Sequence, residues 1–277
     1  MIEKKTLLKL RKQTGLGMLV CKRALAEASG DFSQAIDILR KQGKKIANKK
    51  LGREIEQGAI FTQTNSNQTA AVLIGLGCET DFVAKSDIFV HLSHYIADVA
   101  LAQKPTTKEK LLQLKGNRET VQEEIMNVIG MLGENISLEE YYLVEGPLVA
   151  GYVHTGNKLG AIIALNQAGD TQEKIQAAKD MALQVVASDP LAVNEEGIDP
   201  VVIAREKEEV ARELADSTKS EQVKKQIAEG RIRKFVEKNT LLAQPFVKDE
   251  EITNQAYLTK VAADLSVTTF KRVIVAS

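Results

Sequence analysis

The feature that most constrains the fold is an order of elements that occurs twice along the chain. Each copy has two apolar stretches on either side of a polar turn, followed by an amphipathic helix and a proline. In the first copy, residues 59–61 and 70–76 flank the polar segment 62–69, which predicts a β-hairpin. The repetition predicts a core of two related α+β halves.

The helix of the first copy is predicted to begin after the N-cap Ser86 and to close at Pro105. Its apolar face comprises Phe89, Leu92, Ile96 and Val99. The second copy has predicted strands at 151–154 and 160–165, followed by a helix that ends at a proline. Between the copies, apolar residues recur with helical spacing over 120–132, which predicts a further helix.

Residues 1–53 are predicted to form a separate N-terminal domain of three helices. Asp31 is an expected N-cap for the third helix, with Gln34 completing a capping-box pattern, and Gly43 is an expected helix stop. The basic stretch 44–53 has two interpretations. It could contact RNA or an acidic partner, or it could be a solvated linker helix, which is the commoner role of a charge run.

The remainder of the chain is divided at residue 140, with core halves expected at 54–140 and 141–277. Asp199 and Pro200 form an N-cap followed by proline at the first helical position. Two charged helices joined by a polar turn at 216–220 predict an antiparallel hairpin insertion over about 199–230. Strands are expected at 241–247 and 270–275.

The composition disfavours some classes of function, among them nucleic-acid binding and membrane proteins. The 277 residues carry 37 Lys and Arg against 37 Asp and Glu, and this balance disfavours a nucleic-acid partner, which usually requires a basic surplus. The two cysteines, Cys21 and Cys78, lie far apart, as is usual in a reducing compartment. No apolar run reaches the ~20 residues that span a bilayer. We therefore expect a cytoplasmic protein without membrane contact.

The sequence lacks several motifs that mark common enzyme classes. It has no phosphate-binding GxxxxGK[ST] loop, no GxSxG and no HExxH motif. His91 and His94 are spaced to share a zinc ion, but no fourth ligand has a recognisable spacing. A nucleophile pair of Cys78 and His94 is the other enzymatic alternative. The competing interpretation is that Cys78 is a buried core residue. We expect no metal, no cofactor and no enzymatic activity.

Three stretches resemble one known family. Residues 10–43 (LRKQTGLGMLVCKRALAEASGDFSQAIDILRKQG) resemble its N-terminal ubiquitin-associated-like domain, and residues 78–85 (CETDFVAK) resemble its TDFV signature. Residues 229–247 (EGRIRKFVEKNTLLAQPFV) resemble the segment that re-enters its core after a helical hairpin. The family is that of translation elongation factor Ts, and the resemblance covers nearly the whole chain in the same order.

The resemblance implies a non-catalytic guanine-nucleotide exchange factor. Members of the family bind elongation factor Tu in its GDP-bound form, promote release of GDP and magnesium, and dissociate when GTP binds. One copy is expected to engage one elongation factor Tu, with a two-plus-two assembly as the alternative, and the chain is expected to have no small-molecule substrate of its own. An RNA-binding protein that uses residues 44–53 together with Arg231, Arg233 and Lys234 is the main alternative, although only 4% of the residues are aromatic.

The resemblance also implies which residues contact the partner. In the TDFV motif (Thr80, Asp81, Phe82 and Val83), Phe82 matches the phenylalanine that inserts between helices of the partner's G domain, and Asp81 adds a polar contact beside it. Without the resemblance, Phe82 would be read as a core residue and Asp81 as a helix cap.

Further contacts carry over by position. The matching residues are Lys22, Leu132, Gly133, Glu134, Asn135, His154, Val247 and Lys248. Each has an ordinary alternative: a solvated helix lysine for Lys22, a helix C-cap for Gly133, a structural strand residue for His154 and a strand end for Val247. The chain departs from the family at 137–141, where SLEEY replaces the usual arginines.

Overall fold

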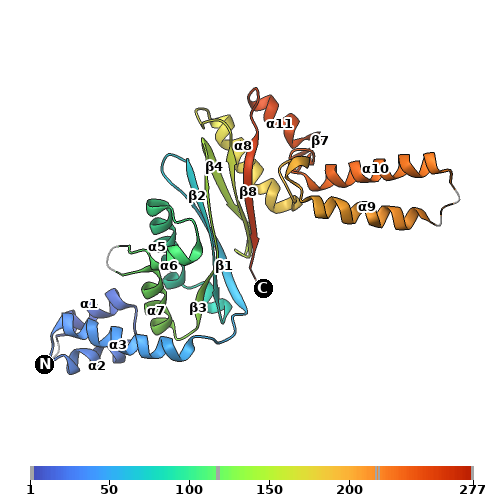
Figure 1. Cartoon of the computed structure of the whole chain (residues 1–277). Coiled ribbons are helices and arrows are strands. Elements are labelled where there is room, and N and C mark those ends of the chain that lie inside the picture. The colour runs from blue at the N-terminus through green and yellow to red at the C-terminus, as the bar shows by residue number, and fades with distance from the viewer. Residues whose placement is uncertain (1–2, 117–118, 216, 218, 276–277) are drawn as a thin grey trace.

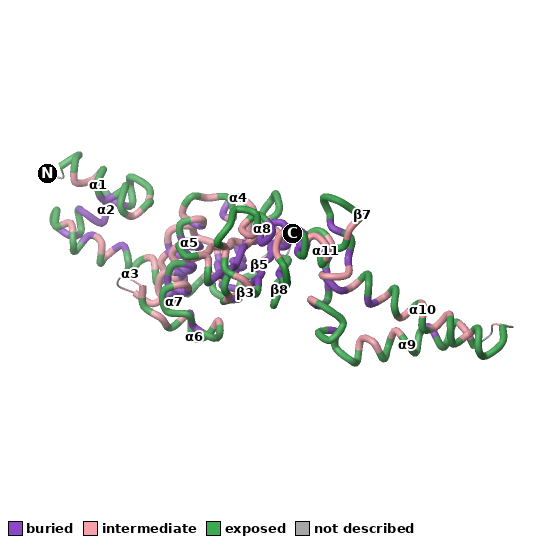
Figure 2. Tube along the Cα trace, turned by 90° about the horizontal axis from the view of Figure 1, so that it is seen from above, coloured by how far each residue is buried: buried purple, intermediate pink, exposed green. Residues whose placement is uncertain are grey.

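The computed structural model describes residues 3–116, 119–215, 217 and 219–275. Within these residues the chain is a mixed α and β protein, as the sequence predicts. An N-terminal group of helices lies at one end, a pair of long helices projects from the other, and two sheets with their covering helices lie between them (Figure 1). Buried residues concentrate in the central part, while the projecting pair is largely exposed or half-buried (Figure 2).

Two antiparallel sheets form the centre. The first has the strand order β1-β2-β3 and the second β4-β5-β8. The first sheet consists of β1 (Gln57–Thr64), β2 (Ala70–Cys78) and β3 (Ile136–Glu145). The second consists of β4 (Leu148–Val153), β5 (Leu159–Leu165) and β8 (Val267–Ile274).

Each central strand is covered on both of its faces. In β2, alternate residues such as Val72 and Ile74 pack under helices, whereas Ala71 and Leu73 pack against the second sheet. This alternation follows from the two-residue period of a strand. The apolar runs in β2 and β5 are continuous because both faces are buried.

Helices cover the outer face of each sheet. The first sheet lies under α4 (Asp81–Ala84), α5 (Asp87–Gln103), α6 (Lys108–Gln113) and α7 (Val121–Leu132). The second lies under α8 (Gln172–Ser188) and α11 (Asn254–Val261), with the short strands β6 (Pro245–Phe246) and β7 (Asp249–Thr253) beside them. The result is four layers, with helices outside and two sheets inside.

The N-terminal helices are α1 (Lys4–Thr14), α2 (Met18–Glu27) and α3 (Phe32–Lys50). They enclose a small core of their own that includes Leu10, Cys21 and Leu25. The Asp31 carboxylate caps α3 by accepting from the Gln34 amide at 2.7 Å. Helix α3 then leaves this core and packs against α7.

The projecting pair consists of α9 (Pro200–Ala215) and α10 (Glu221–Asn239), preceded by a 3-10 turn at Glu195–Gly197. The Asp199 carboxylate accepts from the Val201 amide at 2.8 Å, as expected for an N-cap. The expected turn at 216–220 is only partly covered, since 216 and 218 lie outside the described residues.

Several expectations about boundaries are wrong. Gly43 does not stop α3, which continues to Lys50, and it lies where that helix closely approaches α7. The second helix of the pair extends to Asn239, beyond the expected end near 230. The expected strand at 241–247 is reduced to Pro245–Phe246. This short strand begins at the exposed Pro245 and pairs with β7 in a two-stranded sheet, as is usual for a proline at a sheet edge.

Two further strand boundaries differ. β1 continues to Thr64, so the polar loop after it is shorter than predicted. Residues 137–141 belong to β3, which pairs along the whole of β2 and contains the expected boundary between 140 and 141. The adjacent Glu139 and Glu140 interrupt the apolar alternation of ISLEEYYLVE, so its pattern does not predict a strand.

The buried face under α5 provides a test of the core. Phe89 is fully buried and lies 6.2 Å from the Phe61 ring, measured between centroids. Phe89→Ala should lower the free energy of unfolding by about 3–5 kcal/mol, because it leaves a cavity in a packed layer. Urea denaturation followed by circular dichroism would measure this. Phe82→Ala, at a side chain that is 83% exposed, is the matched control and should shift stability by less than about 0.5 kcal/mol.

Candidate functional site

A corner between β2 and α5 carries the predicted TDFV motif. The Thr80 hydroxyl accepts from the Val83 amide at 3.4 Å and caps α4, and the Ser86 hydroxyl accepts from the Phe89 amide at 3.3 Å and caps α5. Two N-caps in close succession make the chain turn twice within a few residues. The four-residue helix α4 is therefore held at the edge of the core.

The corner turns Val83 inward and Phe82 outward. Val83 is 8% exposed and packs in the core under the helices, whereas Phe82 is 83% exposed. Phe82 is therefore not a core residue, and the helix cap is Thr80 rather than Asp81. Asp81 instead forms an ion pair with Lys85 at 2.7 Å, and the hydrogen bond from Lys85 lowers the pKa of the Asp81 carboxyl.

A reciprocal pair of carboxylates braces this corner from the turn after α7. Glu134 accepts from the Thr80 amide at 3.0 Å and from the Thr80 hydroxyl at 2.7 Å. In the opposite direction, Glu79 accepts from the Asn135 amide at 2.7 Å. Each loop therefore supplies the acceptor for the other loop's backbone, and we call this arrangement the clasp. Hydrogen bonds to a carboxylate are stronger than those between neutral groups.

The clasp also includes the segment that follows α3. Asn135 is only 6% exposed, and its side-chain amide donates to the Arg53 carbonyl at 2.8 Å. The Arg53 guanidinium lies 3.5 Å from the Glu79 carboxylate. Sequence reasoning included Glu134 and Asn135 as contact residues but missed Glu79 and Arg53. No local signal marks these two, because their role depends on three segments that meet only in the fold.

The buried Cys78, at the end of β2, is hydrogen-bonded to the corner. Its thiol donates to the Thr80 carbonyl at 3.1 Å. Burial, and next the negative charge of Glu134, raise the pKa of the Cys78 thiol to about 11. The thiol therefore stays protonated near neutral pH and keeps donating. This does not fit a Cys78–His94 nucleophile pair, which would require a thiolate.

The other predicted residues lie at several places. Gly133 adopts a left-handed φ of 74° and caps the C-terminus of α7 directly after Leu132. A helix C-cap was the alternative interpretation of Gly133 from the sequence. His154 is exposed in the β4–β5 turn, at the same end of the core as the corner. This follows because Gln57 pairs with Cys78 in the first sheet and accepts from the Lys158 amine at 2.7 Å.

Three predicted contacts are not brought to the corner. Lys22 is exposed on α2 in the N-terminal helices. Val247 and Lys248 lie between β6 and β7, on the α8 side of the second sheet. There the Val247 amide donates to the Gln184 side chain at 2.8 Å, and the Lys248 amine lies 2.7 Å from the buried Asp180 carboxylate.

Histidine chemistry finds no support in the geometry. Both His91 and His94 are exposed: His91 contacts the Asp87 carbonyl at 2.6 Å, and His94 contacts the Gln63 side chain at 3.3 Å. Among the described residues, no group of three or more His, Cys, Asp or Glu is placed to hold a metal ion. Within the same residues, no helix has the length and apolar character needed to cross a bilayer.

The basic segments are partly neutralised by acidic neighbours. Lys44 lies 4.0 Å from Glu123, and Arg53 pairs with Glu79. Arg231 pairs with Glu213 of the adjacent helix. These pairings reduce the positive charge that an RNA backbone would meet.

The geometry defines a class of protein: a mixed α and β protein that holds an exposed aromatic side chain on a braced corner, as a contact surface does. Comparison with known proteins then identifies the family. The family model described as Elongation factor TS matches residues 79–277, beginning within the clasp.

Relatives extend the match to nearly the whole chain. A protein named elongation factor Ts from Amoebophilus asiaticus is 46% identical over 268 residues, which is 96% of each chain. The elongation factor Ts of Christiangramia forsetii is 38% identical, covering 96% of this chain and 95% of its own. That of Porphyromonas gingivalis is 39% identical, covering 95% and 94%. The chain belongs to the elongation factor Ts family, and thus to the elongation factors of protein biosynthesis.

The clasp can be tested through stability. Glu134→Ala leaves the Thr80 amide and hydroxyl without their acceptor and should lower the free energy of unfolding by about 1–3 kcal/mol. Glu134→Gln keeps one carbonyl oxygen and should cost less. Urea denaturation would measure both, with Glu250→Ala, an exposed residue of β7, as the control. Equal stabilities for Glu134→Ala and Glu250→Ala would contradict the clasp.

The raised pKa of Cys78 predicts low thiol reactivity. At pH 8 a disulfide reagent should modify Cys78 far more slowly in the folded protein than in urea, because the reactive species is the thiolate. The unfolded thiol ionises first, at a pKa of about 8.5. Stability should therefore fall as pH rises from there towards about 11. Cys78→Ser would isolate the signal of Cys21, and equal native and unfolded rates would contradict the prediction.

Proposed function

We propose that this chain is a non-catalytic guanine-nucleotide exchange factor for elongation factor Tu, acting in the cytoplasm during translation elongation. It binds the GDP-bound partner, promotes the loss of GDP and magnesium, and is released when GTP binds. The observation that carries the proposal is Phe82, which is 83% exposed on a corner that the clasp holds in place. Membership of the elongation factor Ts family supports the choice of partner.

Exchange of this kind needs differential affinity and no chemistry on the nucleotide. If the chain weakens GDP binding by some factor, GDP must weaken binding of the chain by the same factor. Phe82 is suited to supply that difference, because its ring is inserted only in a partner conformation that opens a gap between helices of the G domain. Burying a phenylalanine side chain contributes about 1.5–3 kcal/mol, or roughly ten- to hundredfold in affinity.

The clasp makes the insertion more effective. A flexible loop that carried Phe82 would lose conformational entropy on binding, and this loss would subtract from the affinity. Here Thr80 is fixed by Glu134, and Val83 is buried in the core. The side chain therefore approaches the partner on a backbone that is already ordered. Asp81, paired with Lys85 at the surface, is placed to add a polar contact beside the ring.

The remaining contacts give the partner an extended footprint. Lys22 on α2 and His154 in the β4–β5 turn are exposed and available. Leu132 and Gly133 end α7 at the corner, and in our proposal Glu134 and Asn135 act there mainly by bracing it. Val247 and Lys248, held by α8, provide a second area on the other half of the core.

The test is release of a fluorescent GDP analogue from elongation factor Tu. The wild-type chain should accelerate release, and Phe82→Ala should reduce the acceleration by roughly ten- to hundredfold, because the buried ring is lost. Leu191→Ala is the matched control, since Leu191 is also an exposed apolar side chain (54%) but lies outside the corner. Normal exchange by Phe82→Ala would remove the insertion step. Absence of acceleration by the wild-type chain would remove the exchange function itself.

A further inference from the structure

Two helical glycines meet where the N-terminal helices join the core. Gly43 lies within α3 and Gly130 within α7. A Cβ atom added to Gly130 would lie 2.5 Å from the Gly43 Cα, 2.7 Å from its carbonyl carbon and 2.7 Å from its oxygen. These are backbone atoms, which cannot rotate away as a side chain would. The two helices therefore cross backbone against backbone at this point.

The helices themselves have no need of glycine here. Neither residue has a positive φ, and a glycine within a helix costs about 1 kcal/mol relative to alanine. The close crossing supplies the reason for Gly130. The contact is unequal, because a Cβ on Gly43 would meet the Gly130 Cα at 3.7 Å, an ordinary van der Waals distance. Alanine should thus fit at 43 and not at 130.

Other contacts fix the crossing on both sides. Arg40 lies 3.8 Å from Glu119, and Lys44 lies 4.0 Å from Glu123. At the far side of the N-terminal helices, a Cβ on Gly15 would lie 3.1 Å from the Ile88 side chain at the start of α5. The N-terminal helices therefore touch the core at two places, which sets an angle as well as a position.

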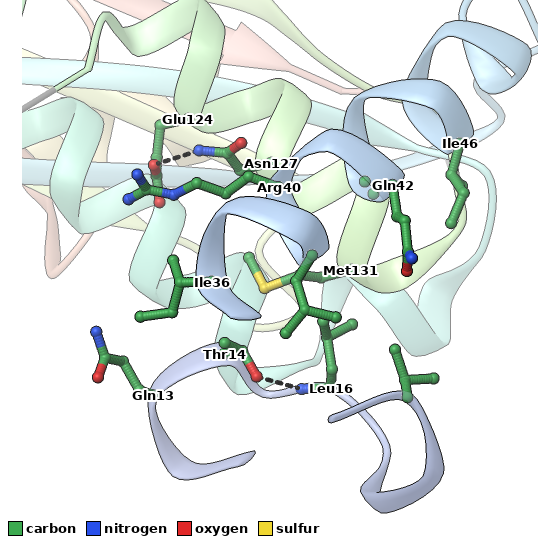
Figure 3. Close-up of a pocket in the computed structure, with 14 residues that line it drawn as sticks. Gln13, Thr14, Leu16, Ile36, Arg40, Gln42, Ile46, Glu124, Asn127 and Met131 are labelled. Atoms are coloured by element: carbon green, nitrogen blue, oxygen red, sulfur yellow. Dashed lines mark hydrogen bonds between the residues drawn. The ribbon is translucent and has the colours of Figure 1, made fainter. Parts of the chain in front are cut away.

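A cleft of about 190 Å³ lies beside the crossing. Figure 3 shows side chains that line it from α3 and α7, among them Ile36, Arg40, Ile46, Asn127 and Met131. The α1–α2 turn closes the cleft with Leu16. At the crossing itself the two backbones touch, so the glycine contact sets how closely α3 and α7 approach each other.

We propose that Gly130 is a positioning residue for nucleotide exchange, an inference that rests on the proposed function. It lets α3 and α7 cross closely and so sets the direction in which α2, with Lys22, faces relative to the Phe82 corner. A methyl group at 130 would have to move α3 by about 1 Å to restore a normal carbon–carbon distance of ~3.5–4.0 Å. Helix α3 passes that movement to the other N-terminal helices, because they share one core.

The experiment compares three glycine-to-alanine variants of the full chain. Gly130→Ala should displace the helices, and Gly43→Ala at the same crossing should not. Gly230→Ala, within α10 and with nothing inside 4 Å of the added Cβ, is the control for helix propensity. Fluorophores on Glu27→Cys in α2 and Ala102→Cys in α5, both exposed positions, report the distance between the N-terminal helices and the core. Release of labelled GDP from elongation factor Tu is measured in parallel.

The proposal expects a changed label distance and at least about tenfold slower exchange for Gly130→Ala, since a misplacement of 1 Å can cost up to about 10²-fold. Gly43→Ala and Gly230→Ala should match the wild type in both. An unchanged distance in Gly130→Ala would overturn the proposed geometry, and a changed distance with normal exchange would overturn the positioning role. Wild-type chain without exchange activity would instead remove the proposed function, a separate outcome.

A second measurement separates positioning from general damage. If Gly130→Ala acts by misplacing α2, then Lys22→Ala should have a much smaller effect in the Gly130→Ala background than in the wild type. A purely destabilising change would leave the effect of Lys22→Ala intact, since distant independent sites add. Should Gly130→Ala fail to fold, the charge reversal Arg40→Glu with Lys44→Glu weakens the same crossing without adding volume. It should change the label distance in the same assay, and an unchanged distance would overturn the proposal.

Discussion

The burial of β2 and β5 on both faces is the constraint on which the rest of the structure depends. Each of these strands lies in the middle of its sheet, with helices on one side and the other sheet on the other. A shift of either strand by one residue would exchange its two sets of side chains between unlike layers. The end of β2 at Cys78 is therefore fixed, and the corner that follows begins at a defined place on the surface.

The corner then combines two opposing requirements. The exposed Phe82 ring adds no packing to the fold, and in the loop that carries it only Val83 is buried. Polar contacts provide the order instead: Glu134 and Glu79 accept from backbone amides across the two loops, and Cys78 donates to Thr80. Hydrogen bonds and the burial of Val83 together order the loop, and the Phe82 ring remains exposed.

The sequence predicted those parts of the molecule whose signals are local. Helix starts at Asp31 and Ser86 were readable because a capping side chain lies three residues before the amide it accepts from. The hairpins were readable from two apolar runs around a polar turn. β3 was not, because Glu139 and Glu140 interrupt its apolar pattern and its partners in β2 lie far back in the sequence, from Cys78 for Ile136 to Ala70 for Glu145. Gly43 resembled a helix stop because its true neighbour, Gly130, is distant in sequence.

In the candidate site, too, the residues with a local sequence signal were predictable and those that depend on distant segments were not. Residues 80–83 could be singled out because they resemble a family signature, and that resemblance led to the exposed ring. The function of Glu79 and Arg53 could not be predicted, since their partners come from the turn after α7. The sequence singled out Glu134 as a partner contact but did not predict its bonds within the chain. Both of its carboxylate oxygens accept hydrogen bonds from Thr80. A positional match therefore does not distinguish a contact from the brace behind it.

The two halves of the core share most of their elements. Both have a hairpin, a 17-residue helix and a third strand that pairs with the second. Both long helices end in a left-handed residue before proline, Lys104 or Asp189, and each of these pairs with the third strand of its sheet, at Glu145 or Arg272. These shared features belong to the fold.

The halves differ at the link from the second strand to the long helix. In the first half the link contains α4 and exposes Phe82. In the second half the described link residues 166–171 contain no helix, and Asn166 ties the start of the link to the segment before β8 by accepting from the Ser266 amide at 2.9 Å and donating to the Asp264 carbonyl at 2.7 Å. The same position in the repeat is thus closed in one half and presents an aromatic side chain in the other. Because the surrounding layers are alike, the two links differ in what they contribute to the fold: one is tied to the segment before β8, and the other leaves an aromatic ring exposed.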